Sequence, residues 1–227
     1  MLKITIITVC YNAVSNIADT IENVLGLNFP NIDFIIIDGA SNDGTAEIIN
    51  RYADNLTHYI SEPDKGIYDA MNKGWKLASD DSFVLYLGAG DKLLNLPKLE
   101  SFDYADVIIG NVQIGDKYLF KGKASIMLKL GNTIHHQAEF VKKSINVTPP
   151  FSLNFPTYAD FNFNQKLLLM DIKFQKDDQF LSFALEGGVS QDLNVGEQLE
   201  VVKSNYGYLC YFASYAYLNI KKIMQKV

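Results

Sequence analysis

The chain has 227 residues, of which 48% are hydrophobic and 20% charged, with a formal net charge of −6. This length suits one large domain or two small ones, and the composition excludes collagen-like, low-complexity and wholly disordered chains. The mean hydropathy of +0.01 excludes a multi-span membrane protein, and the acidic balance excludes a general nucleic-acid binder, which needs a cationic surface.

The first hundred residues alternate strand-like and helical patterns. Short β-branched runs predict buried strands over 3–9, 32–37, 58–61 and 83–87. Apolar residues at helical spacing predict helices over 16–27 and 66–78, and a further helix beginning at Asp43-Gly44-Thr45. Strands and helices that alternate in this way predict an α/β fold with a mostly parallel, doubly wound sheet. The loops after the strands then lie on one edge, where such sheets bind ligands.

The pattern after residue 91 is less regular. It predicts a strand over 106–112, a hairpin turn at Gly115-Asp116 leading to a strand over 118–121, a helix over 158–170 and a strand over 180–185 before Gly187-Gly188. No linker rich in Pro, Gly or Ser interrupts the chain. We therefore predict one domain over 1–200, with a nucleotide-binding half (1–112) and a more variable half (113–200).

The tail, 201–227, differs from the rest because it holds four lysines and no acidic residue. Many of the residues between the lysines are aromatic, including Tyr208, Tyr211 and Phe212. A basic, aromatic-rich helix of this kind can lie on an anionic membrane surface, and its apolar stretch is too short to span a bilayer. The alternative, a helix packed on the domain with solvated lysines, stays open.

The two cysteines, Cys10 and Cys210, lie at opposite ends of the chain and match no metal-ligand spacing. They predict free thiols in a reducing compartment. The first residues run directly into a strand without a secretory pattern. We therefore expect a cytoplasmic protein, at the inner face of the plasma membrane if the tail binds lipid.

Four polar loops follow the predicted strands: 8–12, 38–45, 62–69 and 88–91. A carboxylate at a strand end can accept hydrogen bonds from a ribose or a base. An acid near a diphosphate instead indicates a bridging divalent metal, because carboxylate and phosphate repel. Asp43 has a structural alternative as a helix cap. Asp38 and Asp91 are stronger candidates, since each comes after a buried strand.

These segments resemble the family-2 glycosyltransferases, which have the GT-A fold. The matching runs are Ile6 to Asn12, Ile37 to Thr45 and, most specifically, Ser61 to Gly74. The third run is similar to the subgroup that builds bacterial exopolysaccharide, capsule or O-antigen units. The resemblance is strong over about the first hundred residues and loose beyond them.

The resemblance implies a site for a nucleotide-diphosphate sugar, with UDP as the expected nucleotide. Thr8, Tyr11 and Asp38 would hold the base and the ribose, and Lys65 would make a cationic contact to the nucleotide. The matching positions that would complete the donor site are Asn12, Asp43, Gly66, Asp69 and Asn72.

Asp91 matches the last acid of the family's metal-binding motif and would hold Mg2+ or Mn2+ against the diphosphate. The family motif has two acids or reads Asn-Ser-Gly-Asp, whereas this chain reads Gly88-Ala89-Gly90-Asp91. One carboxylate makes a weaker metal site. A nucleotide-sugar-binding protein that has lost transfer is therefore the main alternative function, with a nucleotidyltransferase as a third.

The second half must supply the acceptor site and a base. Tyr158-Ala159-Asp160-Phe161 resembles a late segment of the family, which makes Asp160 the candidate base of an inverting, hexosyl-type transfer, with helix capping as its alternative role. His136 and Gln137 resemble the subgroup's His-Gln pair near the donor sugar or the acceptor. Because consecutive side chains on a strand point to opposite faces, we expect His136, and not His135, to face the site.

The sequence also lacks the signatures of other classes. It has no Gly-x-Gly-x-x-Gly after the first strand, no P-loop and no Gly-x-Ser-x-Gly. It also lacks the Gln-x-x-Arg-Trp run of processive family-2 synthases. We therefore predict transfer of a single sugar to a lipid-linked or polysaccharide acceptor.

Overall fold

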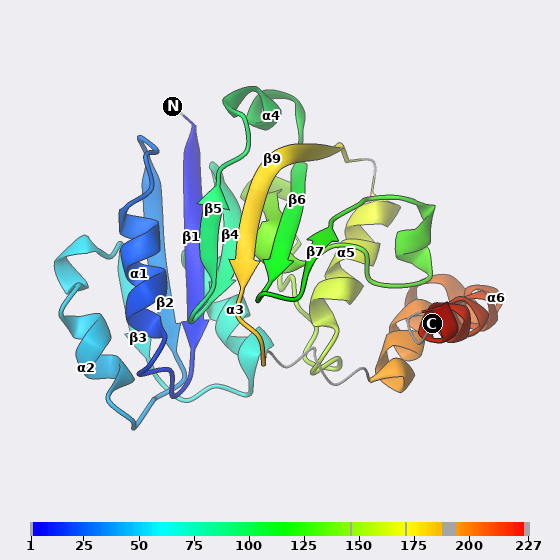
Figure 1. The fold of residues 1–227 in the computed structure, drawn as a ribbon, viewed down its shortest axis with the longest axis horizontal. Coiled ribbons are helices and arrows are strands. Elements are labelled where there is room, and N and C mark those ends of the chain that lie inside the picture. The colour runs from blue at the N-terminus through cyan, green and yellow to red at the C-terminus, as the bar shows by residue number, and fades with distance from the viewer. Residues whose placement is uncertain (1, 146, 171, 188–193, 225–227) are drawn as a thin grey trace.

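The computed structural model describes residues 2–145, 147–170, 172–187 and 194–224. Within them, nine strands form one sheet in the order β3-β2-β1-β4-β8-β6-β9-β5, and β7 pairs with β6. Figure 1 shows β3 and α2 at one end of the molecule and α6 at the other.

The first half of the sheet is parallel. It consists of β1 (Lys3–Cys10), β2 (Ile32–Asp38), β3 (His58–Ser61) and β4 (Ser82–Gly88). β1 lies at the centre of this half, where Thr8 pairs with Ile36 on one side and Leu87 on the other. These strands are runs of apolar, largely β-branched residues because both faces of the sheet are covered. Because the four strands are parallel, their carboxyl ends lie on one edge of the sheet, as the sequence predicts.

Helices cover both faces of the sheet. One face packs against α1 (Ile17–Leu25), α2 (Thr45–Asn50) and α4 (Leu99–Tyr104), through core residues that include Ile21, Ile49 and Phe102. The other face packs against α3 (Ile67–Leu77), α5 (Ala159–Leu169) and the start of α6 (Val195–Met224), through residues that include Trp75 and Phe163. The prediction of a doubly wound α/β fold is confirmed.

The second half of the sheet is mixed, and here the sequence is less informative. β6 (Val107–Ile114) runs parallel to β9 (Phe174–Ala184) and antiparallel to β7 (Tyr118–Lys121) and β8 (Glu139–Lys142). The short β5 (Lys92–Asn95), which pairs with β9, and α4 are not predicted from the sequence. β9 begins at Phe174, earlier than expected, because the residues after Phe174 and before Phe180 are polar and give no apolar strand pattern.

The C-terminal helix α6 consists of two parts. Its backbone is non-helical at Gly207, where φ is 76° and ψ is −174°. This conformation is open to glycine and strained for other residues. Val201 and Val202, before the break, are fully buried in the core. Residue 200, where we divide the catalytic part from the tail, thus lies inside α6, and the division stays a prediction.

No described helix is long and apolar enough to cross a membrane. Both cysteines are free thiols, and Cys10 is buried, as the sequence predicts. The predicted turn that continues from Gly187 into residues 188–190 lies largely outside the described residues.

Candidate functional site

The loops after β1 and β2 are tied together beside the ends of these strands. The backbone N–H of Asn12 donates to Ser41 Oγ at 2.8 Å, and Asn12 Oδ1 accepts from the N–H of Asn42 at 3.0 Å. Asn12 has a positive φ of 49°, which asparagine tolerates better than most residues. The neighbouring Tyr11 side chain is 63% exposed, so its ring is available to a ligand.

Asp38 and Thr8 lie beneath this surface. Asp38 is fully buried, and its carboxylate accepts from the backbone N–H and hydroxyl of Ser41 and from Ser61 Oγ at 2.6 Å. Thr8 is also fully buried, and its hydroxyl has no partner among the described residues. Asp38 thus fixes the shape of its loop here, and direct contact of either residue with a nucleotide stays a prediction.

Asp43 organises the start of α2. Its Oδ1 accepts from the N–H and hydroxyl of Thr45, and its Oδ2 accepts from the N–H of Val14 at 3.1 Å. The hydrogen bonds from Thr45 and Val14 keep the pKa of Asp43 below its ordinary value. Asp43 thus fixes the first residue of α2, although the N-cap itself is Gly44, and it also links the first two loops.

The third loop contributes the exposed Lys65 and two half-buried carboxylates. Asp64 Oδ1 accepts from the N–H of Gly66 at 2.8 Å, and Asp69 Oδ2 accepts from the N–H of Lys65 at 3.0 Å. A Cβ on Gly39 would lie 2.5 Å from Asp64 Oδ2 and 3.4 Å from the Tyr11 ring. Asp64 and Tyr11 therefore flank Gly39 at the surface. The sequence places Asp64 among the acids at the strand ends but assigns it no individual role in the donor site.

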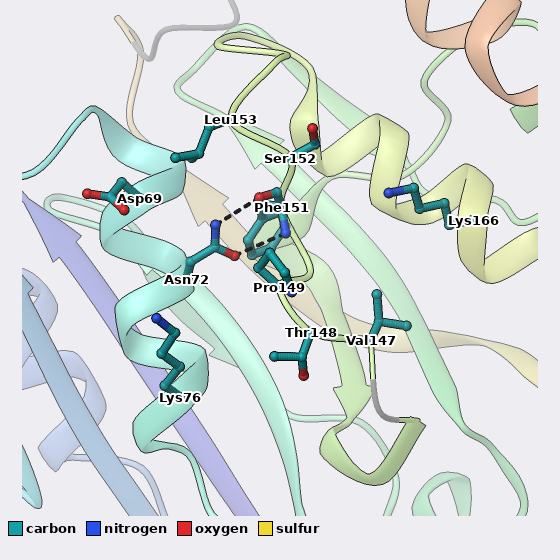
Figure 2. A pocket seen from close by; sticks show the side chains of 10 residues that line it. All are labelled: Asp69, Asn72, Lys76, Val147, Thr148, Pro149, Phe151, Ser152, Leu153 and Lys166. Atoms are coloured by element: carbon teal, nitrogen blue, oxygen red, sulfur yellow. Dashed lines mark hydrogen bonds between the residues drawn. The ribbon is translucent and has the colours of Figure 1, made fainter.

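Asn72 has a structural partner. Its amide donates to Phe151 O at 2.8 Å and its carbonyl accepts from Phe151 N at 3.1 Å, as Figure 2 shows. This pair holds the loop before α5 against α3. Asp69 and Asn72 also line a pocket of about 540 Å³ with Lys76 and Lys166, and neither Asp91 nor Asp160 lines it. Asn72 thus joins α3 to the loop before α5, and its contact with the donor stays a prediction.

Asp91 lies at the turn after β4 and is 6% exposed. Its Oδ2 accepts from Gly88 N at 2.8 Å, and its Oδ1 accepts from Leu185 N at 2.8 Å. Burial raises the pKa of Asp91, against the lowering effect of these hydrogen bonds and of His136, and the net direction is upward. Gly90 has a φ of 97°, and a Cβ there would lie 2.6 Å from Leu185, which explains the glycine in this turn.

His135 and His136 do not lie on a strand, which corrects the basis of our expectation. His136 begins a short 3-10 helix, η3 (His136–Ala138), directly before β8. The His135 ring packs on Phe120 with centroids 4.3 Å apart, and burial lowers its pKa to about 4. His136 Nδ1 instead lies 3.3 Å from Asp160 Oδ2. Gln137 lies close enough to Asp91 to lower the pKa of that carboxyl.

Asp160 lies in the first turn of α5 and is 8% exposed. Its Oδ1 accepts from Phe161 N at 2.7 Å and from Tyr68 Oη at 3.0 Å. Burial raises the pKa of Asp160, but the hydrogen bond and charge of His136 and the Phe161 N–H outweigh it, and the pKa lies below its ordinary value. Asp160 is therefore ionised at neutral pH, as a proton acceptor must be.

Two supporting residues were missed by sequence reasoning. Tyr68, on α3, is buried, contacts Asp160 and also donates to Thr157 O at 2.8 Å. Glu197 Oε1, on α6, accepts from Thr157 N at 2.7 Å and from Tyr158 N at 2.8 Å. These contacts join α3 and α6 to the segment that begins α5. These contacts depend on tertiary packing, which local sequence does not show. Of the two residues, the sequence could have indicated only Tyr68, because it lies within the motif run from Ser61 to Gly74.

Glu139, on β8, is a second buried carboxyl near Asp160. It is 4% exposed, and its Oε1 has no hydrogen-bond partner among the described side chains and backbone. Burial, together with the charge of Asp160, raises the pKa of Glu139 from 4.5 to about 8. The folded protein therefore holds a proton that the unfolded chain releases, so the free energy of unfolding falls as the pH rises from 4.5 to about 8.

Replacing Glu139 by glutamine should remove this fall in the free energy of unfolding with rising pH. We expect Glu139→Gln to raise the free energy of unfolding by roughly 2–4 kcal/mol at pH 8, with the difference shrinking as the pH falls toward 4.5. Thermal melts of both proteins across this range measure the effect. The exposed Glu100→Gln in α4 serves as the control, and wild type and Glu139→Gln curves that stay parallel at every pH would contradict the assignment.

The described residues supply few ligands for a metal. They contain no group of three His, Cys, Asp or Glu side chains arranged to hold one. Asp91 lies at the turn after β4, and both of its oxygens already accept a backbone N–H. This donor set fits a cation that is shared with a bound diphosphate, whose oxygens suit Mg2+ or Mn2+. It does not fit a metal site that holds its cation before a diphosphate is bound.

The separately predicted residues thus converge at one edge of the sheet. Tyr11 and Lys65 are exposed after β1 and β3, whereas Asp91, His136 and Asp160 meet beside the end of β4. In a doubly wound α/β sheet this edge is where ligands bind.

The family follows from comparison with known proteins. The profile of "Glycosyl transferase family 2" matches residues 5–155, which is more than half of the chain. The chain belongs to glycosyl transferase family 2, as its motifs predict.

Individual relatives agree with this assignment. The PGL/p-HBAD biosynthesis glycosyltransferase of Mycobacterium bovis is 32% identical over 145 residues, which cover 58% of this chain and 56% of that protein. The chain thus spans about half the length of this curated relative.

Solved structures show the same fold. Staphylococcus aureus TarS 1–349 in complex with UDP-GlcNAc matches with a TM-score of 0.67 and 18% identity, covering 88% of this chain and 64% of that chain. The mannosyltransferase PcManGT from Pyrobaculum calidifontis, in complex with GDP-Man and Mn2+, matches with a TM-score of 0.58 and 16% identity, covering 94% of this chain and 64% of that one. These likenesses confirm the GT-A-like fold.

Proposed function

We propose that this protein transfers a single sugar from a nucleotide-diphosphate sugar, UDP-linked, to a lipid-linked or polysaccharide acceptor with inversion at the anomeric carbon. The observation that carries the proposal is the pairing of His136 with Asp160 at 3.3 Å, next to Asp91 at the ligand-binding edge of the sheet. Membership of glycosyl transferase family 2 supports it.

The donor would lie along the loops after β1, β3 and β4. The exposed Tyr11 ring offers an apolar surface to the base, and Lys65 offers a positive charge to the nucleotide. Asp38, which is buried, and the exposed Asp43 keep the two loops in place by their hydrogen bonds to Ser41, Ser61, Thr45 and Val14. The complex of TarS with UDP-GlcNAc supports UDP as the nucleotide.

Asp160 would act as the base. The acceptor hydroxyl oxygen attacks the anomeric carbon, its proton passes to the Asp160 carboxylate, and the bond to the diphosphate breaks with its electron pair. His136, with its proton on Nδ1, donates to Oδ2 and keeps the carboxylate ionised before the reaction. Phe161 N–H and Tyr68 fix Oδ1, so the carboxylate cannot rotate freely.

Asp91 would hold Mg2+ or Mn2+ together with the donor diphosphate. When bound, such a cation compensates the negative charge that develops on the leaving diphosphate. The Mn2+ in the PcManGT complex supports the choice of cation. His136 and Gln137, between Asp91 and Asp160, would contact the donor sugar or the acceptor. The cytoplasmic location of the reaction stays a prediction.

Titration of the protein with UDP, with and without Mn2+, followed by an assay of UDP release from UDP-GlcNAc and other UDP-sugars, tests the proposal. We expect UDP to bind more tightly with Mn2+, and at least one UDP-sugar to be consumed in the presence of a bacterial lipid extract. Tight UDP binding without consumption of any donor would instead favour the donor-binding alternative. Absence of UDP binding would contradict both.

A further inference from the structure

The part of α6 after Gly207 presents an apolar face away from the protein. With 100° between successive residues, six positions fall on one side of the helix, and all six are exposed. They are Leu209, Phe212, Ala213, Ala216, Ile220 and Ile223. Leu209 is 85% exposed, Phe212 65% and Ile223 66%. We call these six residues the outer face of α6.

The opposite side of the helix is fixed to the protein. Ser214 is fully buried and donates from Oγ to Leu130 O at 2.6 Å. Tyr217 packs so closely on Gly131 that a Cβ there would lie 3.0 Å from Tyr217 Cε1. These contacts set the rotation of the helix, so the outer face is held away from the core. Figure 1 shows this part of α6 at the end of the molecule, beyond α5.

We propose that the outer face of α6 binds the surface of an anionic lipid membrane, lying in the interface. The positive charge of this part of the chain selects this occupant. Residues 201–227 contain no acid, and Lys221 and Lys222 are exposed and form no ion pair within the described part of the chain. Lys203, by contrast, is paired with Glu200 at 3.0 Å. Lipid phosphates supply the counter-charge to Lys221 and Lys222.

A second copy of the chain fits this face less well. Pairing two outer faces would bring together two helical segments that carry lysines and, after residue 200, no acidic residue. The exposed Tyr208 and Tyr215, 65% and 54% exposed, border the apolar side, where a ring with an apolar body and a polar tip suits the headgroup layer. Since no described helix can cross a bilayer, the geometry is that of a helix lying on the membrane.

The end of α6 acts electrostatically on the segment that leads into η3. Lys221 lies close enough to His135 to add to the lowering of its pKa, which is caused first by burial. His135 precedes His136, the partner of Asp160. The charge of Lys221 thus reaches the segment before η3. A docked helix would bring the protein to lipid-linked acceptors. This last step rests on the proposed function, whereas lipid binding itself does not.

Co-sedimentation of the full chain with vesicles tests the proposal. We expect binding to vesicles of phosphatidylcholine with phosphatidylglycerol, and much weaker binding to phosphatidylcholine alone or at high salt. Leu209→Gln should weaken binding about tenfold by removing an inserted apolar side chain. The double variant Lys221→Gln, Lys222→Gln should weaken it by roughly 30-fold.

The matched control is Leu99→Gln, which changes another exposed leucine, on α4. It should bind vesicles like the wild type. Equal binding of wild type and Leu209→Gln, equal binding to both vesicle types, or dimerisation through this face without vesicle binding would overturn the proposal. UDP titration of each variant separates this result from the proposed function, because loss of vesicle binding should leave the affinity for UDP unchanged.

Discussion

Asp160→Asn should lower the rate of sugar transfer by about 10²–10⁴-fold, the range expected when a general base is removed, while UDP still binds. Asparagine has nearly the same shape and can still accept the hydrogen bond from Phe161 N, but it cannot take the acceptor's proton. UDP release at saturating donor, measured beside a UDP titration, separates the loss of turnover from a loss of binding.

A buried aspartate elsewhere in the sheet provides the control. Asp177, in β9, is 5% exposed and accepts from Lys98 N at 2.8 Å and Ser101 Oγ at 2.8 Å. Asp177→Asn should lower the melting temperature but leave turnover intact below that temperature. A similar loss of turnover in both variants, or full activity of Asp160→Asn, would contradict the role of Asp160.

Asp91→Asn should abolish the effect of Mn2+ on UDP binding and lower turnover by about 10²–10³-fold, because the leaving diphosphate loses its cation. The variant also turns one accepting oxygen into an amide that faces a backbone N–H, from Gly88 or Leu185. We therefore expect a loss of stability of about 1–3 kcal/mol as well. Calorimetric titration of UDP with and without Mn2+ measures the first effect, and thermal melts measure the second.

The pH dependence gives a second readout for Asp91. Burial raises the pKa of this carboxyl, so protonation should weaken the Mn2+ effect at a higher pH than for an ordinary aspartate. Mn2+ alone should bind weakly, since the described residues form no three-ligand group. The exposed Asp116→Asn, in the hairpin between β6 and β7, should leave both properties unchanged. An unchanged Mn2+ effect in Asp91→Asn would place the cation elsewhere.

Much of the first half of the fold can be predicted from the sequence. The runs that form β1, β2 and β4 are buried on both faces, so they are continuous apolar segments that only a covered parallel strand explains. The four loops between them carry the family motifs. Local sequence therefore identifies both the strands and the edge at which ligands bind.

The second half depends on contacts that local sequence does not contain. α5 buries Asp160, Asn162, Asn164 and Gln165, so its polar residues do not mark an exposed face. The contact of His136 with Asp160 joins residues 24 positions apart and exists only because η3 packs beside the start of α5. The burial of Asp38 beneath Ser41 and Ser61 likewise follows from loop packing, which a motif does not reveal.

A crystal structure of the protein with UDP-GlcNAc and Mn2+ tests the central claim most directly. We predict the uracil beside Tyr11, the diphosphate and Mn2+ at Asp91, and the anomeric carbon of the sugar facing Asp160 and His136. A donor that binds instead in the pocket between Asn72 and Lys166, or a sugar that lies away from Asp160, would contradict the proposed site and its base.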